Sequence, residues 1–488
     1  MLVASTILSV LVSAAPLQRP PNIVLVMADD LGWNEVGAYG QEKIRTPNMD
    51  RLAAEGMLLT DHYSGSAVCA PSRCVLMTGK HSGHAVVRAN WENGGWGEDE
   101  PEGQYPLPEE EVTIAEALKA NGYATGCFGK WGLGGPGTVG HPNEQGFDQF
   151  VGYLCQRRAH NFYPTHLWKN QEKLPLGNPY HKGHEKITEP LEDEADYQQR
   201  WSSGTYSCDV MRDAALEFIH DHAEEPFFLY YPSLIPHVAI QVPEEETNAY
   251  PREWDTEAYL GQKGYLPHAR PNAAYAGMIS RLDREIGQLV DALVEEGIED
   301  ETIILITSDN GTTWAGGVDA SFFDSTGQWR GLKGSLYEGG IRVPMIAWWP
   351  GHIEANSRSA VPSSFQDHLP TICAVAGITP PPGHDGRNLL PVLTGDQDAV
   401  NREHLYWEYA AKQAVRKGRW KALRVKLKKG DTTIELYDLE RDPGETTNVA
   451  NDHPQVVAEM ARIMDTEHVA SDAFPLPTID TPADTPAP

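Results

Sequence analysis

The sequence predicts an α/β fold, in which a sheet is covered by helices on both faces, together with a smaller C-terminal α+β subdomain. Short apolar runs bounded by turn residues alternate with helical patterns over most of the chain, which is typical of such a sandwich. Near residue 399 the pattern changes to closely spaced short strands. The 488 residues also exceed the length at which a single core stops growing, so one large and one smaller domain are expected.

Five apolar runs predict the strands of the main sheet. They are 22–27 (NIVLVM), 123–128 (YATGCF), 226–231 (PFFLYY), 302–307 (TIILIT) and 343–349 (VPMIAWW). Helical patterns are found near 47–55, 112–120, 208–222 and 273–296. In the C-terminal part, 403–409, 413–423 and 433–439 predict short strands of a small antiparallel sheet, and a helix is expected at 453–467.

The two ends of the chain differ in composition from the rest. Residues 1–15 are apolar and end in small residues, although they lack a basic start, and we predict a signal peptide there. We assign 20–398 to the large domain, 399–472 to the C-terminal subdomain and 473–488 to a disordered tail. No other apolar run approaches the roughly 20 residues that span a bilayer. We therefore expect a periplasmic or secreted protein.

Charge and cysteine content narrow the function classes. Acidic side chains outnumber basic ones by 69 to 39, and the formal net charge is -30. This balance disfavours a nucleic acid or an anionic membrane as partner, and an anionic substrate would need local cations. The cysteines, at 69, 74, 127, 155, 208 and 373, form no CxxC pair, so disulfides are not expected to hold the fold. The only Asn-x-Ser/Thr sequence is Asn310-Gly311-Thr312, which we expect at a buried site. The absence of an exposed glycosylation sequence favours a bacterial protein over a glycosylated eukaryotic one.

Polar residues follow four of the predicted strands at the point where each strand ends. They are Asp29 with Asp30, Lys130, His237, and Asp309 with Asn310. Because sites in open α/β sheets form beyond the carboxyl ends of strands, we expect these side chains at one edge. Three carboxylates and an amide are hard oxygen donors, which suit calcium or magnesium rather than zinc. The alternative is that the paired acids cap the helices that follow.

One motif singles out Cys69. The stretch Cys69-Ala70-Pro71-Ser72-Arg73 continues to Leu76 and Thr78-Gly79 and matches the pattern C-x-P-S-R-x-x-L-x-T-G. Further segments follow in order between Asn22 and about Asn448: MADD, GKW, PH, SDNG, KGSLYEGGIRVP, DGRNLLP and LYDLERDPGE. This ordered set resembles the formylglycine-dependent sulfatases of the alkaline phosphatase-like superfamily. The resemblance implies a sulfuric ester hydrolase, arylsulfatase-like, whose large mixed sheet lies between helices.

The resemblance also implies a modification of Cys69. In that family a formylglycine-generating enzyme oxidises this cysteine to Cα-formylglycine, whose aldehyde hydrates to a geminal diol. One hydroxyl attacks sulfur, and loss of the proton from the second expels sulfate by C–O cleavage. Pro71 is tolerated in the first turn of the following helix, whose N-terminus would face the bound sulfate.

The remaining roles are carried over from the resemblance, residue by residue. Asp29, Asp30, Cys69, Asp309 and Asn310 are implied as the ligands of one calcium ion, and Asp309 as the acceptor of the nucleophile's proton. Arg73, Lys130 and Lys333 are implied to neutralise the sulfate oxygens. His237 is implied to protonate the departing alcohol.

One position departs from the family pattern. The family reads Gly-Lys-x-His-Leu-Gly, and that histidine contacts the second hydroxyl of the diol, whereas this chain has Gly132 in GKWGLGG. We predict that His160, or else His141, supplies the base that releases sulfate. The alternative is impaired turnover.

The sequence defines the substrate less closely. Candidate sugar contacts that follow the catalytic motifs are His84, Arg88, Trp91, Arg157 and His160, with loop stabilisation as the alternative for each. We expect a sulfated carbohydrate or an aryl sulfate as the substrate. The alternatives are a phosphodiester or phosphonate monoester hydrolase of the same superfamily, a catalytically impaired sulfoglycan-binding relative, and a hydrolase of small cationic esters such as choline sulfate.

Overall fold

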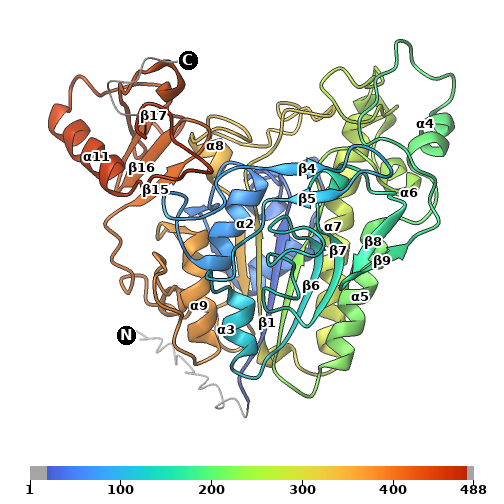
Figure 1. Ribbon diagram of the computed structural model, residues 1–488, viewed down its shortest axis with the longest axis horizontal. Coiled ribbons are helices and arrows are strands. Elements are labelled where there is room, and N and C mark those ends of the chain that lie inside the picture. Colours follow the sequence, from blue (N-terminus) through green and yellow to red (C-terminus); the bar gives the residue numbers. More distant parts are fainter. Residues whose placement is uncertain (1–18, 481–488) are drawn as a thin grey trace, which may run out of the picture.

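A computed structural model describes residues 19–480, so the predicted signal peptide at 1–15 lies outside the described residues. Ten strands form one mixed sheet (Figure 1). In sheet order they are β13 (Ser357–Ser359), β2 (Met57–Leu59), β12 (Met345–Trp348), β11 (Thr302–Ser308), β1 (Asn22–Ala28), β10 (Phe227–Pro232), β6 (Ala124–Lys130), β7 (Gln149–Tyr153), β8 (His166–Lys169) and β9 (Glu172–Pro175). The five strands from β11 to β7 are parallel, and antiparallel pairs flank them on both sides.

Helices cover both faces of this sheet (Figure 1). One layer contains α1 (Pro47–Glu55), α5 (Ser207–Asp221) and α7 (Pro271–Glu295). The other layer contains α2 (Cys69–Thr78), α3 (Ile114–Lys119) and α9 (His368–Val375). The predicted sandwich of helices around a sheet is therefore confirmed.

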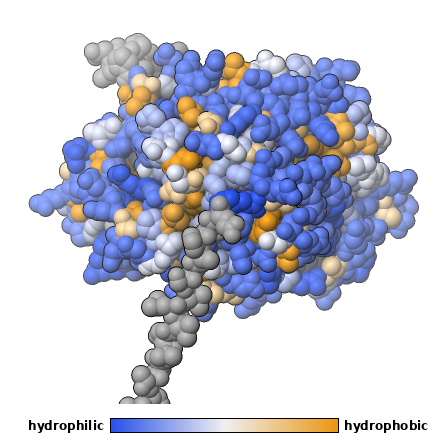
Figure 2. Space-filling model, turned by 90° about the horizontal axis from the view of Figure 1, so that it is seen from below, coloured by the Kyte–Doolittle hydropathy of each residue, from blue (hydrophilic) through white to orange (hydrophobic). Residues whose placement is uncertain are grey.

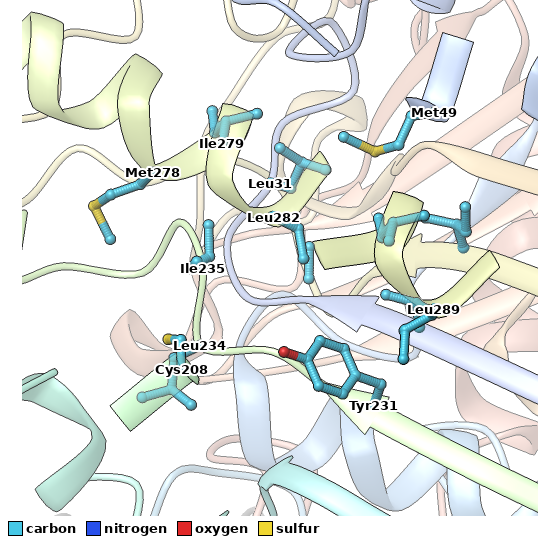
Figure 3. Packing of buried hydrophobic residues seen from close by; sticks show 14 of the residues in the cluster. Leu31, Met49, Cys208, Tyr231, Leu234, Ile235, Met278, Ile279, Leu282 and Leu289 are labelled. Carbon is cyan, nitrogen blue, oxygen red and sulfur yellow. The ribbon is translucent and has the colours of Figure 1, made fainter. Parts of the chain in front are cut away.

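Alternation along the central strands divides the core into two halves. On β1, Val24 and Val26 pack into the cluster that contains α7, whereas Leu25 and Met27 pack into the cluster that contains α2. Successive strand side chains point to opposite faces, so a strand that is apolar throughout can serve both layers. Figure 3 shows Leu282 and Leu289 of α7 facing Tyr231 of β10 in the first half of the core.

The C-terminal part forms a separate antiparallel sheet of β15 (Leu405–Glu408), β16 (Gln413–Lys417), β17 (Trp420–Arg424) and β18 (Glu435–Asp438), with α11 (Pro454–Thr466) packed on it. This sheet lies beside α2 and the short helix α8 (Glu338–Ile341) (Figure 1). Lys421 is fully buried and bridges Glu338 (2.7 Å) and Glu445 (3.4 Å), and Trp407 Nε1 donates to the carbonyl of Ser64 (2.9 Å). Buried polar contacts therefore join the two parts.

Smaller elements complete the chain. They are α4 (Glu194–Trp201), α6 (Glu244–Asn248), α10 (Leu390–Leu393), the pair β3 (His62–Tyr63) with β14 (Ser363–Ser364), and the pair β4 (Glu92–Gly94) with β5 (Glu102–Gln104). Short 3-10 helices occur at 37–39, 158–160, 252–254, 299–301, 365–367 and 427–429.

The five predicted main strands correspond to β1, β6, β10, β11 and β12, and the predicted C-terminal helix is also found. Of the three predicted C-terminal runs, 403–409 and 433–439 contain β15 and β18, whereas 413–423 forms the hairpin of β16 and β17, because Gly418 allows a turn with positive φ. The prediction of a disordered tail over 473–488 is wrong for 473–480. Phe474 packs against Trp91 and Tyr105, and Leu476 is buried with Ala411 and Leu427, because this segment supplies the apolar cover that those residues need. Residues 481–488 lie outside the described part.

One face of the surface is mostly polar. The face seen from below in Figure 2 is mostly hydrophilic, and its hydrophobic residues gather in small separate patches. Among residues 19–480, no helix is both long enough and apolar enough to cross a membrane.

Candidate active site

The structure brings the predicted polar residues together at the carboxyl ends of four neighbouring strands. Asp29 and Asp30 follow β1, Lys130 is the last residue of β6, His237 lies just beyond β10, and Asp309 and Asn310 follow β11. Because β11, β1, β10 and β6 are adjacent and parallel, these ends meet at one edge of the sheet.

Cys69 joins this cluster from the start of a helix. It is the first residue of α2 and is 1% exposed, and its Sγ lies 3.3 Å from Asp29 Oδ1 and 3.4 Å from Lys333 Nζ. Asp29, Asp30, Cys69 and His237 each offer an atom within 4.8 Å of the others. The thiol therefore lies between the carboxylates and the cations of the site.

Three cations pair with three carboxylates in this cluster. Lys130 Nζ lies 2.5 Å from Asp29, and Lys333 Nζ lies 2.7 Å from Asp30. Arg73 contacts Asp309 at 2.8 Å. These side chains are almost fully buried except that of Lys333, which is 16% exposed. Buried charges need partners of opposite sign. In each pair the basic side chain could bind an anionic ligand and the carboxylate could bind a metal cation.

Burial and these neighbouring charges shift the pKa values of the carboxyl groups. Burial alone would raise the pKa of Asp29, but the charges of Lys130, His237 and Arg73 hold it well below its usual range. Burial and the charges of Asp29 and Asp30 raise the pKa of Asp309 to about 7. Opposite shifts in two adjacent carboxylates are typical of a functional site.

The two nitrogens of His237 have different roles. Its Nδ1–H donates to the carbonyl of Val238 (2.5 Å), so Nε2 of the neutral ring is unprotonated, and this nitrogen faces Asp30 Oδ2 at 3.7 Å. Burial and the charge of Lys333 lower the pKa of His237 to about 4. The ring therefore accepts a proton at Nε2 only when an additional negative charge comes close.

The donor set fits a hard cation. Asn310 Nδ2 donates to Asp30 Oδ1 (2.7 Å), whereas Asn310 Oδ1 is buried without a hydrogen-bond partner. An orphaned amide oxygen beside three buried carboxylates matches the oxygen ligands that calcium prefers. Asp29, Asp30, Asp309 and Asn310 could thus hold one ion together with the side chain at position 69.

Two of the candidate sugar contacts lie elsewhere, and for these the loop-stabilisation alternative holds. His84 Nδ1 lies 3.0 Å from Asp385, and Arg88 contacts Glu408 (2.7 Å) and the carbonyl of Val469. Both tie the loop after α2 to neighbouring segments, and neither contacts a residue of the cluster. Their position in the sequence misled because α2 runs from Cys69 to Thr78, so the residues that directly follow it begin about 15 Å from the site.

His141 is also placed away from the cluster, so its prediction as the release base is wrong. Its Nδ1 accepts from the amide of Asn143 (3.2 Å), and its ring packs against Phe150 of β7. Phe150 pairs with Cys127, three residues before the end of β6, so His141 lies below the edge where the cluster forms.

His160, in contrast, lies at the cluster. Its ring is parallel to that of His237, with centroids 5.2 Å apart. Arg157, three residues earlier, bonds the carbonyl of Gly94 and lies 4.4 Å from the ring centre of Trp96, so it belongs to the rim. Trp91 is 48% exposed and stacks on Tyr105.

Comparison with known proteins identifies the family. The family model described as Sulfatase matches residues 21–378. The chain belongs to the sulfatase family. A second model, described as N-sulphoglucosamine sulphohydrolase, C-terminal, matches residues 329–469 and so covers the β15–β18 sheet of this sulfatase.

Two human proteins are similar over most of this sulfatase. Human arylsulfatase A is 32% identical over 94% of this chain and 90% of its own. Human N-acetylgalactosamine-6-sulfatase is 30% identical over 84% of this chain and 72% of its own. The chain is therefore an enzyme of the sulfatase class.

Solved structures agree on the alkaline phosphatase-like fold. Ps i-CgsB in complex with k-i-k-neocarrahexaose is 27% identical, with a TM-score of 0.73 over 92% of both chains. A phosphonate monoester hydrolase of Agrobacterium radiobacter is 22% identical, with a TM-score of 0.63 over 92% of this chain and 96% of its own, and it shows the fold alone.

Several residues of the sulfatase site carried no sequence signal. His184 and Tyr265 pack at the rim beside His160, from loops without a motif. Tyr409 lies in the turn between β15 and β16, where Lys412 Nζ donates to the carbonyl of Gly334 (2.8 Å), next to Lys333.

Proposed function

We propose that this sulfatase uses Cα-formylglycine at position 69 and one calcium ion to hydrolyse a sulfated carbohydrate or an aryl sulfate. The observation that carries the proposal is the position of Cys69 Sγ, which contacts both Asp29 (3.3 Å) and Lys333 (3.4 Å). One atom at this place can reach a cation held by the carboxylates and a sulfate held by the lysines.

Calcium at Asp29, Asp30, Asp309 and Asn310 would polarise the sulfate group and favour ionisation of the nucleophile. The buried, unpartnered Oδ1 of Asn310 and the three buried carboxylates support this assignment. Lys130, Lys333 and Arg73 pair with the three carboxylates and hold them close together.

A hydrated formylglycine at position 69 would supply a hydroxyl nucleophile and a second hydroxyl for release of sulfate. The thiol itself is a poor nucleophile here, because burial and the charges of Asp29 and Asp309 raise the pKa of Cys69. The intact motif from Cys69 to Arg73 supports modification by a formylglycine-generating enzyme.

The cations hold the substrate in this proposal. Lys130, Lys333 and Arg73 converge on the side of the cluster that Cys69 faces, and donors fixed in this way stabilise charge as it develops on sulfate oxygens. Lys333 is the most exposed of the three, so the substrate enters on its side.

His237 is the proton donor to the departing alcohol in this proposal. Its Nε2 is free to take a proton, and the negative charge of a bound sulfate ester would raise its lowered pKa. The bond from Nδ1 to the carbonyl of Val238 holds the ring so that Nε2 keeps facing the cluster.

The substrate class rests on the relatives. N-acetylgalactosamine-6-sulfatase is named for a sulfated sugar, and Ps i-CgsB was solved with k-i-k-neocarrahexaose. A carbohydrate sulfate is therefore our first candidate, and aryl sulfates the second. We place the enzyme in the periplasm or outside the cell, on the composition of residues 1–15.

A phosphodiester or phosphonate monoester hydrolase is the second candidate, because such an enzyme shares the fold. Paired kinetics separate the two. Protein made together with a formylglycine-generating enzyme should give a higher kcat/KM on a panel of sulfate esters than on matched phosphodiesters and phosphonate monoesters. A preference for the phosphorus esters would overturn the proposal, and binding of sulfated glycans without any turnover would indicate an impaired relative.

A further inference from the structure

Four aromatic rings form a contiguous group at the rim of the site. The His160 ring is parallel to that of His237, with centroids 5.2 Å apart and an interplanar angle of 13°. His184 lies 5.2 Å from His160 on another side, and Tyr265 contacts both of these rings, at 5.0 Å from His160 and 4.3 Å from His184. The group draws on four segments that are far apart in the sequence.

Hydrogen bonds fix the proton positions in this group. The backbone N–H of Tyr265 donates to His184 Nδ1 (3.2 Å), and a backbone amide can only donate, so His184 Nδ1 carries no proton. The proton of His184 is therefore on Nε2, which lies 3.0 Å from His160 Nδ1. His160 Nδ1 is then the acceptor, and the proton of His160 is on Nε2.

The Nε2–H of His160 is available to a ligand. Within residues 19–480 no hydrogen bond uses this nitrogen, and the ring is only half-buried. The ring is stacked on that of His237, whose Nε2 lies 3.7 Å from Asp30, so it borders the cluster. His237, stacked on it, has the opposite arrangement, with its unprotonated Nε2 toward the cluster.

We propose that His160 is a fixed, neutral hydrogen-bond donor whose Nε2–H binds a hydroxyl or ether oxygen of the sulfated alcohol, close to the ester. The proposal rests on the proposed function and adds a residue that selects the substrate. A neutral N–H attracts an oxygen lone pair and offers nothing to a quaternary ammonium group, so it favours a carbohydrate sulfate over a choline-type ester.

This assignment replaces our prediction that His160 is the base that releases sulfate. A base needs a free lone pair toward the reacting group, and here Nε2 holds the proton. A shift to the other tautomer would place a proton on His184 Nδ1, opposite the N–H of Tyr265, and leave two donors facing each other. Burial and the neighbouring His237 and His184 also lower the pKa of His160 well below its usual value, which keeps the ring neutral.

Substrate selectivity tests the proposal. His160→Met keeps the volume but removes the donor, His160→Gln keeps an N–H donor, and His181→Met in the neighbouring loop is the control. The probes are para-nitrophenyl sulfate and the sulfated monosaccharide that the parent enzyme hydrolyses best. We expect His160→Met to lower kcat/KM on the sugar about tenfold more than on the aryl ester, mainly through KM, with partial recovery in His160→Gln. His184→Phe should show a weaker version of the same selective loss.

Neutron diffraction tests the tautomer without relying on activity. Deuterium on Nε2 of His160 and on Nε2 of His184 is the expected result, and deuterium on Nδ1 of His160 would overturn the proposal. Equal losses on both probes in His160→Met, with no recovery in His160→Gln, would also overturn it and leave His160 as support for His237. If the parent hydrolyses no sulfate ester, the proposed function fails, whereas the neutron result still decides the tautomer.

Discussion

Gln156 occupies the space that a side chain at position 132 would need. A Cβ on Gly132 would lie 2.6 Å from Gln156 Nε2 and 3.0 Å from its Cγ, and Gly132 has a φ of +81°. Gln156 is 1% exposed and its Nε2 has no hydrogen-bond partner among the described residues, so it has little room to move aside. The loop is thus adapted to glycine, and a side chain at position 132 would require Gln156 to shift.

Gly132→Ala should therefore be more destabilising than Gly137→Ala. Both glycines have positive φ, but a Cβ on Gly137 would meet nothing within 4 Å. The strain of the backbone is common to both, and only Gly132→Ala adds the contact with Gln156. Thermal unfolding of the two variants measures the difference.

Gln156→Gly should recover part of the loss in Gly132→Ala and none in Gly137→Ala. A coupling of about 1 kcal/mol is expected for side chains in contact. Additive effects of Gly132→Ala and Gln156→Gly on the free energy of unfolding would show that Gln156 does not fill this space.

Mass spectrometry should find formylglycine at position 69. Protein made with a formylglycine-generating enzyme should yield a peptide about 18 Da lighter than the thiol form at Cys69. Cys69→Ala should abolish turnover, whereas Cys74→Ala, which alters the same buried helix, should keep most of it. Parental activity in Cys69→Ala would contradict the role of this residue.

Removal of calcium should lower the melting temperature. A ligand that binds only the folded state adds about 2.7 kcal/mol of stability at 100 times its Kd. Chelation should reverse this gain, and calcium should restore it. The stabilisation by calcium should be smaller in Asn310→Ala. It should be unchanged in Asn22→Ala, because Asn22 is a buried asparagine at the start of β1, away from the acids that follow this strand. Recovery with zinc but not with calcium would contradict the oxygen-ligand assignment.

Glu35 should make stability fall as pH rises between about 4.5 and 7. Burial raises the pKa of this carboxyl to about 7, although Gly32 N–H and the Tyr275 hydroxyl donate to it. In this window the folded state holds a proton that the unfolded state has lost, so the free energy of unfolding falls with pH, by up to about 1.4 kcal/mol per unit. Thermal unfolding across the window should give a flatter profile for Glu35→Gln, and parallel profiles would contradict the shift.

The central strands and the edge that carries the acidic cluster could be predicted because their signals are local. Strands β1, β10 and β11 are continuous apolar runs. Acids follow β1 and β11, and His237 follows β10, so polar residues mark their carboxyl ends. The order of the ten strands and the antiparallel flanks could not be predicted, because they join distant parts of the chain, as where Leu58 of β2 pairs antiparallel with Ile346 of β12.

The positions of the histidines also depend on contacts between distant parts of the chain. His237 has a motif, but His84 and His160 have equally suggestive neighbours in the sequence, and only the path of the loops separates them. His84 turns toward Asp385, whereas His160 turns toward His237. The proton position on His160 depends on a backbone amide at Tyr265, more than 100 residues away, which no sequence pattern encodes.

The near-complete enclosure of Cys69 sets an order of events during biosynthesis. The thiol is 1% exposed, with Asp29 on one side and, on the other, the Lys333 loop, which Lys412 from the last-made sheet supports. No modifying enzyme can reach it once these segments have closed. With formylglycine formed at position 69 as we propose, oxidation and folding would compete for the same nascent chain, and the faster of the two would decide the yield of active protein. A variant that folds more quickly would be expected to carry more unconverted thiol.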